Sequence, residues 1–307
     1  MNISEVYDLI IIGGGPAGMA AGIYSSRKKM KTFIISKDLQ GQMKWATHVE
    51  NYPGTKNISG LDLVKDFEEH LREYDAEIVL NEVIQIKKEN KMFEVIDKDG
   101  NRHLGLSVVI ASGANPRTID VKGEKEYLGK GVAYCTTCDA PFFKDKIVAV
   151  IGGGNSGFQA AEELLKYASK IYLLERNDEL RADQYVIDQL KDKIDIITSA
   201  EIKSIEGNNF VEKIIYEDKK SKKMHSINLS GVFILSGTQP ATTFIDELVD
   251  FDDRKKIVID LNNKTKTEGL FSAGDCSNIP YNQIIIAAGE GAKAALSAYD
   301  YLREIQK

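Results

Sequence analysis

The residues best suited to chemistry in this chain are two cysteines, Cys135 and Cys138, separated by two residues. Two thiols at this spacing can close a small disulfide ring and reopen it with little backbone movement, so the pair stores two electrons. Asp139 directly follows the second cysteine and puts a candidate proton donor beside its sulfur. The spacing therefore predicts a redox-active dithiol.

Two structural alternatives exist for this pair: half of a metal site, or two cysteines of a hydrophobic core. A zinc site needs two further ligands, and the candidates are Cys276 and four histidines scattered along the sequence, none at ligand spacing. We therefore favour the redox pair and expect no metal site. Cys276 stands alone, and we expect it to be structural.

The first element that must position this chemistry is a glycine-rich turn, Gly13 to Gly18, with the pattern G-x-G-x-x-G. It lies between a predicted buried strand at 7–12 and a predicted helix at 19–29, which is the context that a dinucleotide site needs. Its glycines allow the tight turn, close approach to a pyrophosphate and close packing of helix on strand, while the helix N-terminus offers N–H groups. The next predicted strand, 31–36, ends without the expected ribose-binding acid.

The same pattern recurs at Gly152 to Gly157, after a predicted strand at 147–151 and before a predicted helix at 158–166. Two structural glycine turns are the alternative interpretation. Because each motif has its own strand and helix and the dithiol lies between them, this internal repeat indicates two dinucleotide cofactors in one chain.

The strand predicted at 170–174 ends at Glu175, about twenty residues beyond the second motif, where an acid binds the ribose hydroxyls of NAD. A carboxylate there would repel the 2′-phosphate of NADPH. Arg176 and Arg181 act in the other direction, since guanidinium groups bind phosphate well, unless they lie on a solvated loop. The sequence favours NADH over NADPH.

Composition limits the protein class. A chain of 307 residues, 43% hydrophobic and 28% charged, is typical of a soluble protein of two domains. A net charge of 40 − 46 = −6 argues against nucleic acid as the main partner. No segment approaches the ~20 apolar residues of a membrane span. Three cysteines and no signal-peptide pattern indicate the cytoplasm.

Further elements follow from hydrophobic patterns. The helix predicted at 60–74 has Leu61, Val64, Phe67 and Leu71 on one face. Asp275, the last residue of a strand predicted at 269–275, could accept a hydrogen bond from a ribityl hydroxyl. The start of the helix predicted at 283–302 could direct backbone N–H groups at a ring carbonyl. Additional strands are predicted at 83–87, 92–96, 106–110, 194–197, 211–216, 224–227 and 232–235.

Taken together, the chain resembles the low-molecular-weight thioredoxin reductases, and more closely the reductase portion of the alkyl hydroperoxide reductase flavoprotein subunit. The resemblance covers essentially the whole chain, and the cysteine pair followed by Asp139 between two glycine motifs is highly specific. The matching stretches are 13–18, 49–54, 135–143, 152–157 and 274–301.

The resemblance implies an α/β fold of the class II pyridine nucleotide-disulfide oxidoreductases, with two Rossmann-like dinucleotide-binding domains, one inserted in the other. Residues 1–116 and 244–307 would form a discontinuous FAD-binding domain, and residues 117–243 an NAD(P)H-binding domain with the dithiol. The thioredoxin-like module that precedes the flavoprotein subunit's reductase portion is not found here, so thioredoxin or a separate thioredoxin-like dithiol protein is expected as acceptor. A homodimer is also implied.

The resemblance also implies residue roles. Cys138 would lie next to the isoalloxazine, Cys135 would attack the disulfide of the partner, and Asp139 would protonate the leaving thiolate. The implied NAD(P)H residues are Gly152, Gly154, Asn155, Ser156, Gly157, Glu175, Arg176 and Arg181. The implied FAD residues are Gly13, Gly15, Pro16, Ala17, Gly18, Gly41, Gln42, Asn51, Val83, Gly113, Gly274, Asp275, Gln283 and Ile284.

Two departures from the family pattern stand out. Ala140 replaces a usual glycine, which predicts a stiffer turn after Asp139. Glu175-Arg176-Asn177 replaces the His-Arg-Arg of thioredoxin reductases, which weakens the case for NADPH, although the later Arg181 is kept.

The predicted function is a disulfide reductase that moves electrons from NAD(P)H through FAD and the Cys135–Cys138 pair to thioredoxin or a similar protein. One alternative is an NADH oxidase or peroxide-linked flavoprotein that feeds a peroxiredoxin. Another is a non-enzymatic flavin redox sensor, in which the dithiol acts only as a switch. The second glycine motif with Glu175 counts against the sensor, because a protein without an electron donor would not need it.

Overall fold

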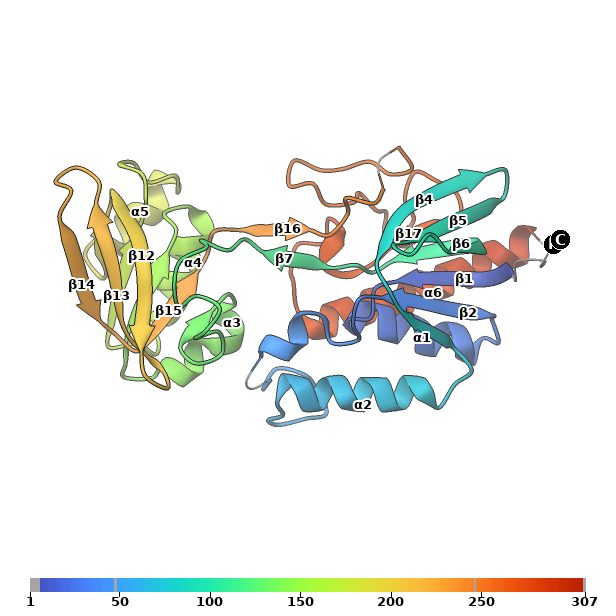
Figure 1. The fold of residues 1–307 in the computed structure, drawn as a ribbon, viewed down its shortest axis with the longest axis horizontal. Coiled ribbons are helices and arrows are strands. Elements are labelled where there is room, and N and C mark those ends of the chain that lie inside the picture. Colours follow the sequence, from blue (N-terminus) through green and yellow to red (C-terminus); the bar gives the residue numbers. More distant parts are fainter. Residues whose placement is uncertain (1–5, 47–48, 246, 306–307) are drawn as a thin grey trace. The chain divides into compact units, whose positions relative to one another are not determined.

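The computed structural model describes residues 6–46, 49–245 and 247–305, and the chain divides into two compact units (Figure 1). The first unit contains the residues up to Lys44, then Asn51–Asn115, and the residues from Gln239 onward. The second contains Pro116–Thr238 with the short segment Trp45–Glu50. The second unit therefore interrupts the sequence of the first.

A seven-stranded sheet lies at the centre of the first unit, in the order β3-β2-β1-β6-β5-β4, with β17 also paired to β6. The pairs among β1, β2, β3, β6 and β17 are parallel, whereas β4 and β5 pair antiparallel. The strands are β1 (Val6–Ile12), β2 (Thr32–Ser36), β3 (Glu77–Leu80), β4 (Val83–Glu89), β5 (Met92–Asp97), β6 (Arg102–Ile110) and β17 (Leu270–Ser272).

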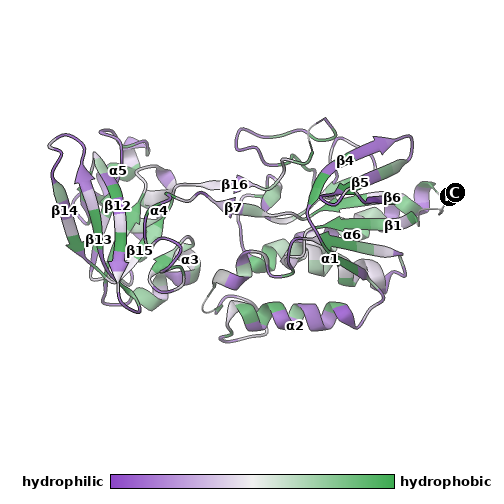
Figure 2. Ribbon diagram, in the orientation of Figure 1, coloured by the Kyte–Doolittle hydropathy of each residue, from purple (hydrophilic) through white to green (hydrophobic). Residues whose placement is uncertain are grey.

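Strand β6 joins the two parts of this sheet. Its first half pairs antiparallel with β5, with Phe93 opposite Gly105, and its second half pairs parallel with β17, with Leu270 opposite Val108. Residues 9–12 of β1 and 108–110 of β6 are at most 4% exposed. Burial on both faces explains why these two segments are continuous apolar runs rather than alternating ones (Figure 2).

Three long helices accompany the sheet: α1 (Pro16–Arg27), α2 (Gly60–Arg72) and α6 (Ile284–Ile305). Two single turns, η1 (Gly41–Trp45) and η3 (Gly274–Cys276), complete the regular structure of this unit. Helices α1 and α6 are in close contact, because a Cβ on Gly291 would overlap the carbonyl oxygen of Ala17. Among the described helices, none has the length and apolar character needed to cross a membrane.

Helix α2 corrects one prediction. Val64 and Leu71 are buried and Phe67 is half-buried, but Leu61 is 53% exposed and Leu63 is buried instead. The buried stripe runs along Gly60, Val64 and Leu71. Leu61 lies about 100° around the helix axis from Gly60, on the side away from Leu63.

The second unit contains an all-parallel sheet in the order β11-β10-β9-β15-β8. Its strands are β8 (Val132–Ala133), β9 (Ile147–Ile151), β10 (Lys170–Leu174), β11 (Asp195–Ile197) and β15 (Gly231–Ile234). Its helical elements are α3 (Thr136–Asp139), η2 (Ala140–Phe143), α4 (Asn155–Leu164) and α5 (Gln184–Leu190).

A separate antiparallel sheet, β12-β13-β14, completes this unit. It consists of β12 (Ala200–Gly207), β13 (Val211–Asp218) and β14 (Met224–Asn228). The lysine cluster at 219–223 lies at the turn between β13 and β14. The two connections between the units contain β7 (Ala114–Pro116) and β16 (Thr238–Pro240), which pair with each other.

The hairpin of β5 and β6 in the first unit is held by a buried carboxylate, Asp97, whose side chain is 1% exposed. It accepts hydrogen bonds from the backbone N–H of Asp99 and of Asn101, from the Asn101 side chain, and from His103 at 3.1 Å. The ring of His103 in turn stacks on Phe33, with centroids 4.5 Å apart. Removing a buried acceptor with this many partners is costly, since four hydrogen bonds are lost together.

We predict that Asp97→Ala lowers the free energy of unfolding by roughly 3 kcal/mol, because three N–H donors and the His103 ring lose this buried acceptor. Urea denaturation at neutral pH, followed by far-ultraviolet circular dichroism, measures the change. Asp253→Ala is the matched control, because Asp253 is exposed, and it should shift stability by no more than about 0.5 kcal/mol.

The effect of Asp97 should depend on pH. Burial alone would raise the pKa of Asp97, but hydrogen bonds from Asn101 and His103 lower that pKa below its ordinary value. The stabilisation is therefore complete above the unfolded pKa of about 4 and is lost as the pH falls below it. The difference between wild type and Asp97→Ala should shrink in acid, and a difference that stayed constant down to about pH 3 would contradict this account.

Candidate functional site

The cysteine pair forms a disulfide at the start of α3 in the second unit, with the Cα atoms of Cys135 and Cys138 5.4 Å apart. Both cysteines are half-buried, and the backbone N–H of Cys138 donates to Cys135 Sγ at 3.2 Å. Asp139, also half-buried, ends the same helical turn. The two cysteines are thus a bonded pair at a partly exposed turn.

Ala140, next along the chain, is fully buried at φ −53° and ψ −40°. This is ordinary right-handed helical backbone, so alanine fits there without strain. Phe143 follows and packs edge-on against Phe233 of β15, with centroids 5.0 Å apart. The segment after the dithiol is therefore anchored in the core of the second unit.

The segment before the dithiol is anchored by a residue that the sequence analysis missed. Glu124 is 1% exposed and accepts hydrogen bonds from Tyr134 Oη at 2.7 Å and from the Ile119 N–H at 3.0 Å. Burial, together with this carboxylate, raises the pKa of Tyr134 well above its usual range. Tyr134 immediately precedes Cys135, so the pair fixes the chain at its entry to the dithiol. No local pattern distinguishes Glu124 from the exposed acids around it.

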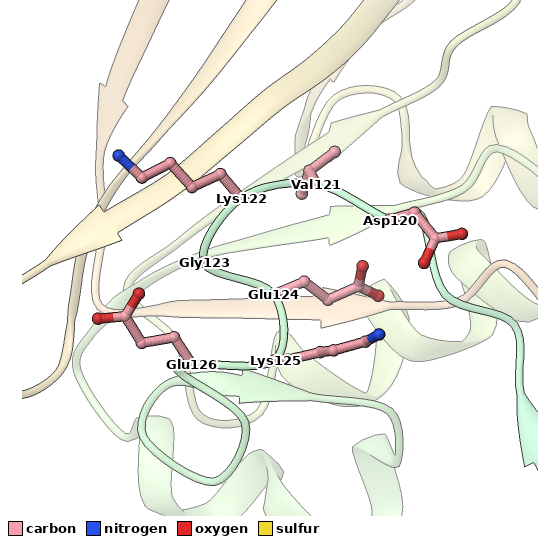
Figure 3. Close-up of a pocket in the computed structure, with 7 residues that line it drawn as sticks. All are labelled: Asp120, Val121, Lys122, Gly123, Glu124, Lys125 and Glu126. Carbon is pink, nitrogen blue, oxygen red and sulfur yellow. The ribbon is translucent and has the colours of Figure 1, made fainter.

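Glu124 is also one of the residues, 120–126, that line a surface hollow of about 380 Å³ (Figure 3). The hollow is lined by charged side chains of both signs and contains none of the predicted site residues. We assign it no role.

In the first unit, the glycine turn after β1 has the geometry predicted for a dinucleotide site. Gly13 has φ +113°, and a Cβ there would overlap the backbone of Ala111. A Cβ on Gly18 would overlap the carbonyl oxygen of Gly13, so helix α1 lies directly against the turn. A Cβ on Gly15, at the N-terminus of α1, would meet no atom within 4 Å. The turn thus leaves open space in front of the helix N-terminus, which fits a pyrophosphate.

Several predicted FAD residues gather around this turn. A Cβ on Gly41 would lie 3.3 Å from Gly15 Cα, so η1 passes close to the loop. Gln42 donates to Asp275 Oδ2 at 3.0 Å, although the two residues are far apart in sequence. A Cβ on Gly274, which has φ +75°, would lie 3.1 Å from Ala17 Cβ, so η3 passes close to the start of α1.

Asp275 also experiences the charge of the buried Lys256, a residue that the sequence analysis missed. Desolvation raises the pKa of Asp275, while the Lys256 ammonium and the Gln42 amide partly offset that rise. Lys256 Nζ also donates to Ile279 O at 3.3 Å and Asn282 Oδ1 at 3.1 Å, just before helix α6. Lys256 therefore couples the Asp275 carboxylate to the segment that leads into α6.

The remaining predicted FAD residues are more dispersed. Asn51 donates to Gln283 Oε1 at 3.1 Å, and Ile284 begins α6. Gly113, at φ +70°, accepts a hydrogen bond from the Ala241 N–H. Val83 is 7% exposed at the start of β4, with its side chain in the hydrophobic core of the first unit.

The second glycine turn repeats this geometry in the second unit. Gly152 has φ +124°, a Cβ on Gly157 would overlap the Gly152 carbonyl oxygen, and a Cβ on Gly154 would meet no atom within 4 Å. Asn155 and Ser156 form the first turn of α4, and the Asn155 side chain accepts from the Asp183 N–H at 2.8 Å. This turn, too, fits a dinucleotide.

The two turns differ in the side chain that accepts a hydrogen bond from the residue after the first glycine of the motif, Gly14 in one unit and Gly153 in the other. In the first unit the N–H of Gly14 donates to Ser36 Oγ at 2.8 Å. In the second unit the N–H of Gly153 donates to Glu175 Oε2 at 2.6 Å. The strand-end residue is thus a neutral hydroxyl in one unit and a carboxylate in the other.

Glu175 is 3% exposed, and its Oε1 accepts two further hydrogen bonds from the backbone and side chain of Asn177, both at 2.9 Å. A carboxylate offers about four acceptor positions, so Oε2 keeps capacity for a ribose hydroxyl. The Arg181 guanidinium lies 3.9 Å from Oε2. Arg176 pairs instead with Glu201 at 3.0 Å.

Cys276 is fully buried in the first unit, and its sulfur lies 3.4–3.5 Å from Ser272 Oγ and from two carbonyl oxygens. Within the described residues, no group of three or more His, Cys, Asp or Glu side chains is arranged to hold a metal ion.

Comparison with known proteins agrees with this architecture. Residues 7–295 match the family model described as "Pyridine nucleotide-disulphide oxidoreductase". The chain is 39% identical over 309 residues to a component of the alkyl hydroperoxide reductase of Escherichia coli K12 and 37% identical over 300 residues to a Bacillus subtilis NADH dehydrogenase. These matches cover 98% and 97% of this chain, but 59% of each relative.

Among solved structures, the thioredoxin reductase of Streptococcus pyogenes MGAS5005 superposes with a TM-score of 0.93 at 35% identity, covering 97% of this chain and 99% of that one. The thioredoxin reductase of Giardia duodenalis superposes with a TM-score of 0.91 at 33% identity, with the same coverage. The predicted fold class, with its two Rossmann-like domains, is confirmed.

We predict that Gly15→Ala and Gly154→Ala each weaken binding of one dinucleotide by roughly tenfold or more, because each added methyl would occupy the open space in front of a helix N-terminus. Both glycines have ordinary backbone angles, with φ of −77° and −95°, so alanine should not strain the fold. The FAD-to-protein ratio by absorbance should fall in Gly15→Ala alone. The affinity for NAD⁺ should fall in Gly154→Ala alone.

Gly18→Ala is the contrasting variant, since its methyl would overlap the Gly13 carbonyl oxygen. It should lower the melting temperature of the apoprotein, whereas Gly15→Ala should leave that temperature unchanged. Full FAD content in Gly15→Ala would contradict this assignment of the first turn.

Proposed function

We propose a function from the finding that this chain belongs to the pyridine nucleotide-disulphide oxidoreductase family. The protein moves electrons from NADH through FAD and the Cys135–Cys138 pair to thioredoxin or a thioredoxin-like protein. The family implies a flavoprotein disulfide reductase that uses FAD and NAD(P)H; the preferred nucleotide and the acceptor are our proposals. The observation that carries them is the half-buried disulfide at the start of α3, in a chain with two glycine turns that each leave open space for a pyrophosphate.

We assign FAD to residues 1–116 and 244–307 and the nicotinamide nucleotide to residues 117–243. When bound, FAD would accept hydride from the nicotinamide and deliver two electrons to a disulfide. On the protein side, the turn at Gly15 would hold the pyrophosphate of FAD, and Asp275 would accept from its ribityl chain. Gln42 supports this role, because its hydrogen bond to Asp275 orients the carboxylate.

The dithiol then reduces the acceptor by thiol–disulfide exchange. The Cys135 thiolate attacks one sulfur of the partner's disulfide, forming a mixed disulfide and releasing the partner's other sulfur as a thiolate, which Asp139 protonates. The Cys138 thiolate next attacks Cys135 Sγ, which closes the Cys135–Cys138 disulfide and releases the partner's second thiol. The partner gains two electrons and two protons, and the dithiol loses the same number. The Cα separation of 5.4 Å suits closure without backbone movement.

We propose NADH as the donor. Glu175 keeps one acceptor position for a ribose hydroxyl and would repel a 2′-phosphate. The arginine nearest in sequence, Arg176, is paired with Glu201. The names of two relatives, one belonging to an alkyl hydroperoxide reductase and the other to an NADH dehydrogenase, also keep open a second candidate, in which the electrons reach a peroxiredoxin system or oxygen.

We further propose a homodimer in the cytoplasm, where a reducing environment lets the dithiol cycle. Analytical ultracentrifugation and cell fractionation test these two points.

We predict that Cys138→Ser and Cys135→Ser each lower NADH-driven reduction of thioredoxin by more than about 100-fold, because neither variant can form the dithiol. Anaerobic reduction of the flavin by NADH should persist in both, because it precedes the dithiol step. Cys276→Ser is the matched control, since Cys276 is buried in the first unit and unpaired, and it should retain thioredoxin reduction. Reduction of thioredoxin at the wild-type rate by Cys138→Ser would overturn the proposal.

We predict that NADH reduces the flavin at least about tenfold faster than NADPH does at equal subsaturating concentrations, because Glu175 opposes a 2′-phosphate. Anaerobic stopped-flow absorbance of the flavin band measures both rates. Glu175→Gln keeps the shape of the side chain and should reduce the ratio of the NADH rate to the NADPH rate. A faster rate with NADPH would mean that the arginines outweigh Glu175, and no reduction by either nucleotide would refute the proposed donor.

A further inference from the structure

Arg176 would ordinarily argue against a preference for NADH. It directly follows Glu175, at the end of β10, and its side chain is 70% exposed. A guanidinium beside the ribose-binding acid is the group that accommodates a 2′-phosphate. In this protein, however, Arg176 Nη2 lies 3.0 Å from Glu201 Oε1.

Backbone hydrogen bonds between the end of β10 and the start of β12 set the position of Glu201. The N–H of Glu175 donates to Ile197 O, and the N–H of Ala200 donates to Glu175 O, both at 2.9 Å. A third bond joins the Ser199 N–H to Asn177 O at 2.9 Å. These bonds hold the start of β12 beside the end of β10, so Glu201, the second residue of β12, comes next to Arg176.

A chain of alternating charges keeps Glu201 ionised and in place. Lys203 Nζ lies 2.6 Å from Glu201 Oε2 and 3.0 Å from Glu217 Oε2. The hydrogen bond and charge of Lys203 lower the pKa of Glu201 below its ordinary value, so Glu201 is a carboxylate at neutral pH. Because Lys203 is shared with Glu217, Glu201 keeps negative charge to attract Arg176.

We propose that Glu201 is a specificity-determining residue, which excludes the 2′-phosphate of NADPH by occupying the Arg176 guanidinium and by placing a carboxylate where that guanidinium would bind the phosphate. This rests on the proposed function, namely that the second unit binds the nicotinamide nucleotide at its glycine turn. Glu201 acts in two ways on NADPH, by competition for Arg176 and by direct repulsion. NADH, which lacks the phosphate, meets neither effect.

The size of the effect on affinity for NADPH follows from the solvent exposure of the Arg176–Glu201 ion pair. Exposed ion pairs change an equilibrium constant by up to about fivefold. Competition and repulsion together should therefore amount to about five- to tenfold in affinity for the phosphorylated nucleotide. High salt should reduce this factor, since both effects act between exposed charges.

The test uses the holoenzyme and the oxidised nucleotides NAD⁺ and NADP⁺, which bind without delivering hydride. Isothermal titration calorimetry should find that Glu201→Gln binds NADP⁺ about five- to tenfold more tightly than wild type, with affinity for NAD⁺ unchanged within about twofold. Steady-state kinetics should repeat the pattern as a lower KM for NADPH at unchanged kcat.

Two further variants identify the cause. Glu206→Gln is the matched control, because Glu206 lies on the same strand but pairs with Lys213 rather than with Lys203 or Arg176, and it should leave both affinities unchanged. Adding Arg176→Ala to Glu201→Gln should remove most of the gain, because the freed guanidinium is what would bind the phosphate.

Two results would overturn the inference: an affinity for NADP⁺ that Glu201→Gln leaves unchanged, or a gain that persists in full without Arg176. A failure of the proposed function has a different signature. In that case Gly154→Ala would leave the affinity for NAD⁺ unchanged, whatever Glu201 does.

Discussion

The close approach of backbone to backbone at two glycine turns is the constraint on which the rest of this structure depends. In each unit the last glycine of the motif lies so near the carbonyl oxygen of the first that no side chain fits between them. This contact brings a helix N-terminus to the end of a buried parallel strand. It also leaves the middle glycine facing open space, where free N–H groups and the helix dipole favour an anion. The strands beneath can be apolar throughout, because the site lies beyond their ends.

From this shared geometry the two units diverge at one position. In the first unit the Ser36 hydroxyl accepts a hydrogen bond from the Gly14 N–H. In the second unit the Glu175 carboxylate accepts the equivalent hydrogen bond from the Gly153 N–H. A hydroxyl holds the turn without adding charge, whereas a carboxylate also places a negative charge at the turn. Under the proposed function, this difference at the end of a strand is what would let the second turn discriminate between NADH and NADPH, with Arg176 and Glu201 adjusting the preference.

Buried polar groups fix the positions of site residues that the glycine turns do not contact. Glu124 fixes Tyr134 ahead of the dithiol, and Lys256 links Asp275 to the segment before α6. Hydrogen bonds made by buried groups are strong, so each of these groups holds the residues bonded to it in one arrangement. Their effect on the chemistry is indirect: they position the residues that would touch sulfur or cofactor.

The sequence alone determined those features that depend on a few neighbouring residues. The glycine turns, the cysteine pair and strands such as β9 and β10 follow from local rules of backbone conformation, β-branched runs and spacing, and β9 and β10 have the predicted bounds. The short elements β3, β8, α3 and α5 were not predicted, because segments of two to seven residues are stabilised by the sheet and helices around them rather than by their own pattern.

Only the tertiary structure decided which charged residues meet. Nothing near Lys256 in the sequence indicates that its charge acts on Asp275, and nothing near Glu201 indicates that it holds Arg176. The exposure of Leu61 was likewise set by how α2 packs, and not by its periodicity. The physical reason is the same in each case. Burial and charge pairing depend on groups brought together from distant parts of the chain, whereas a turn or a strand is encoded where it lies.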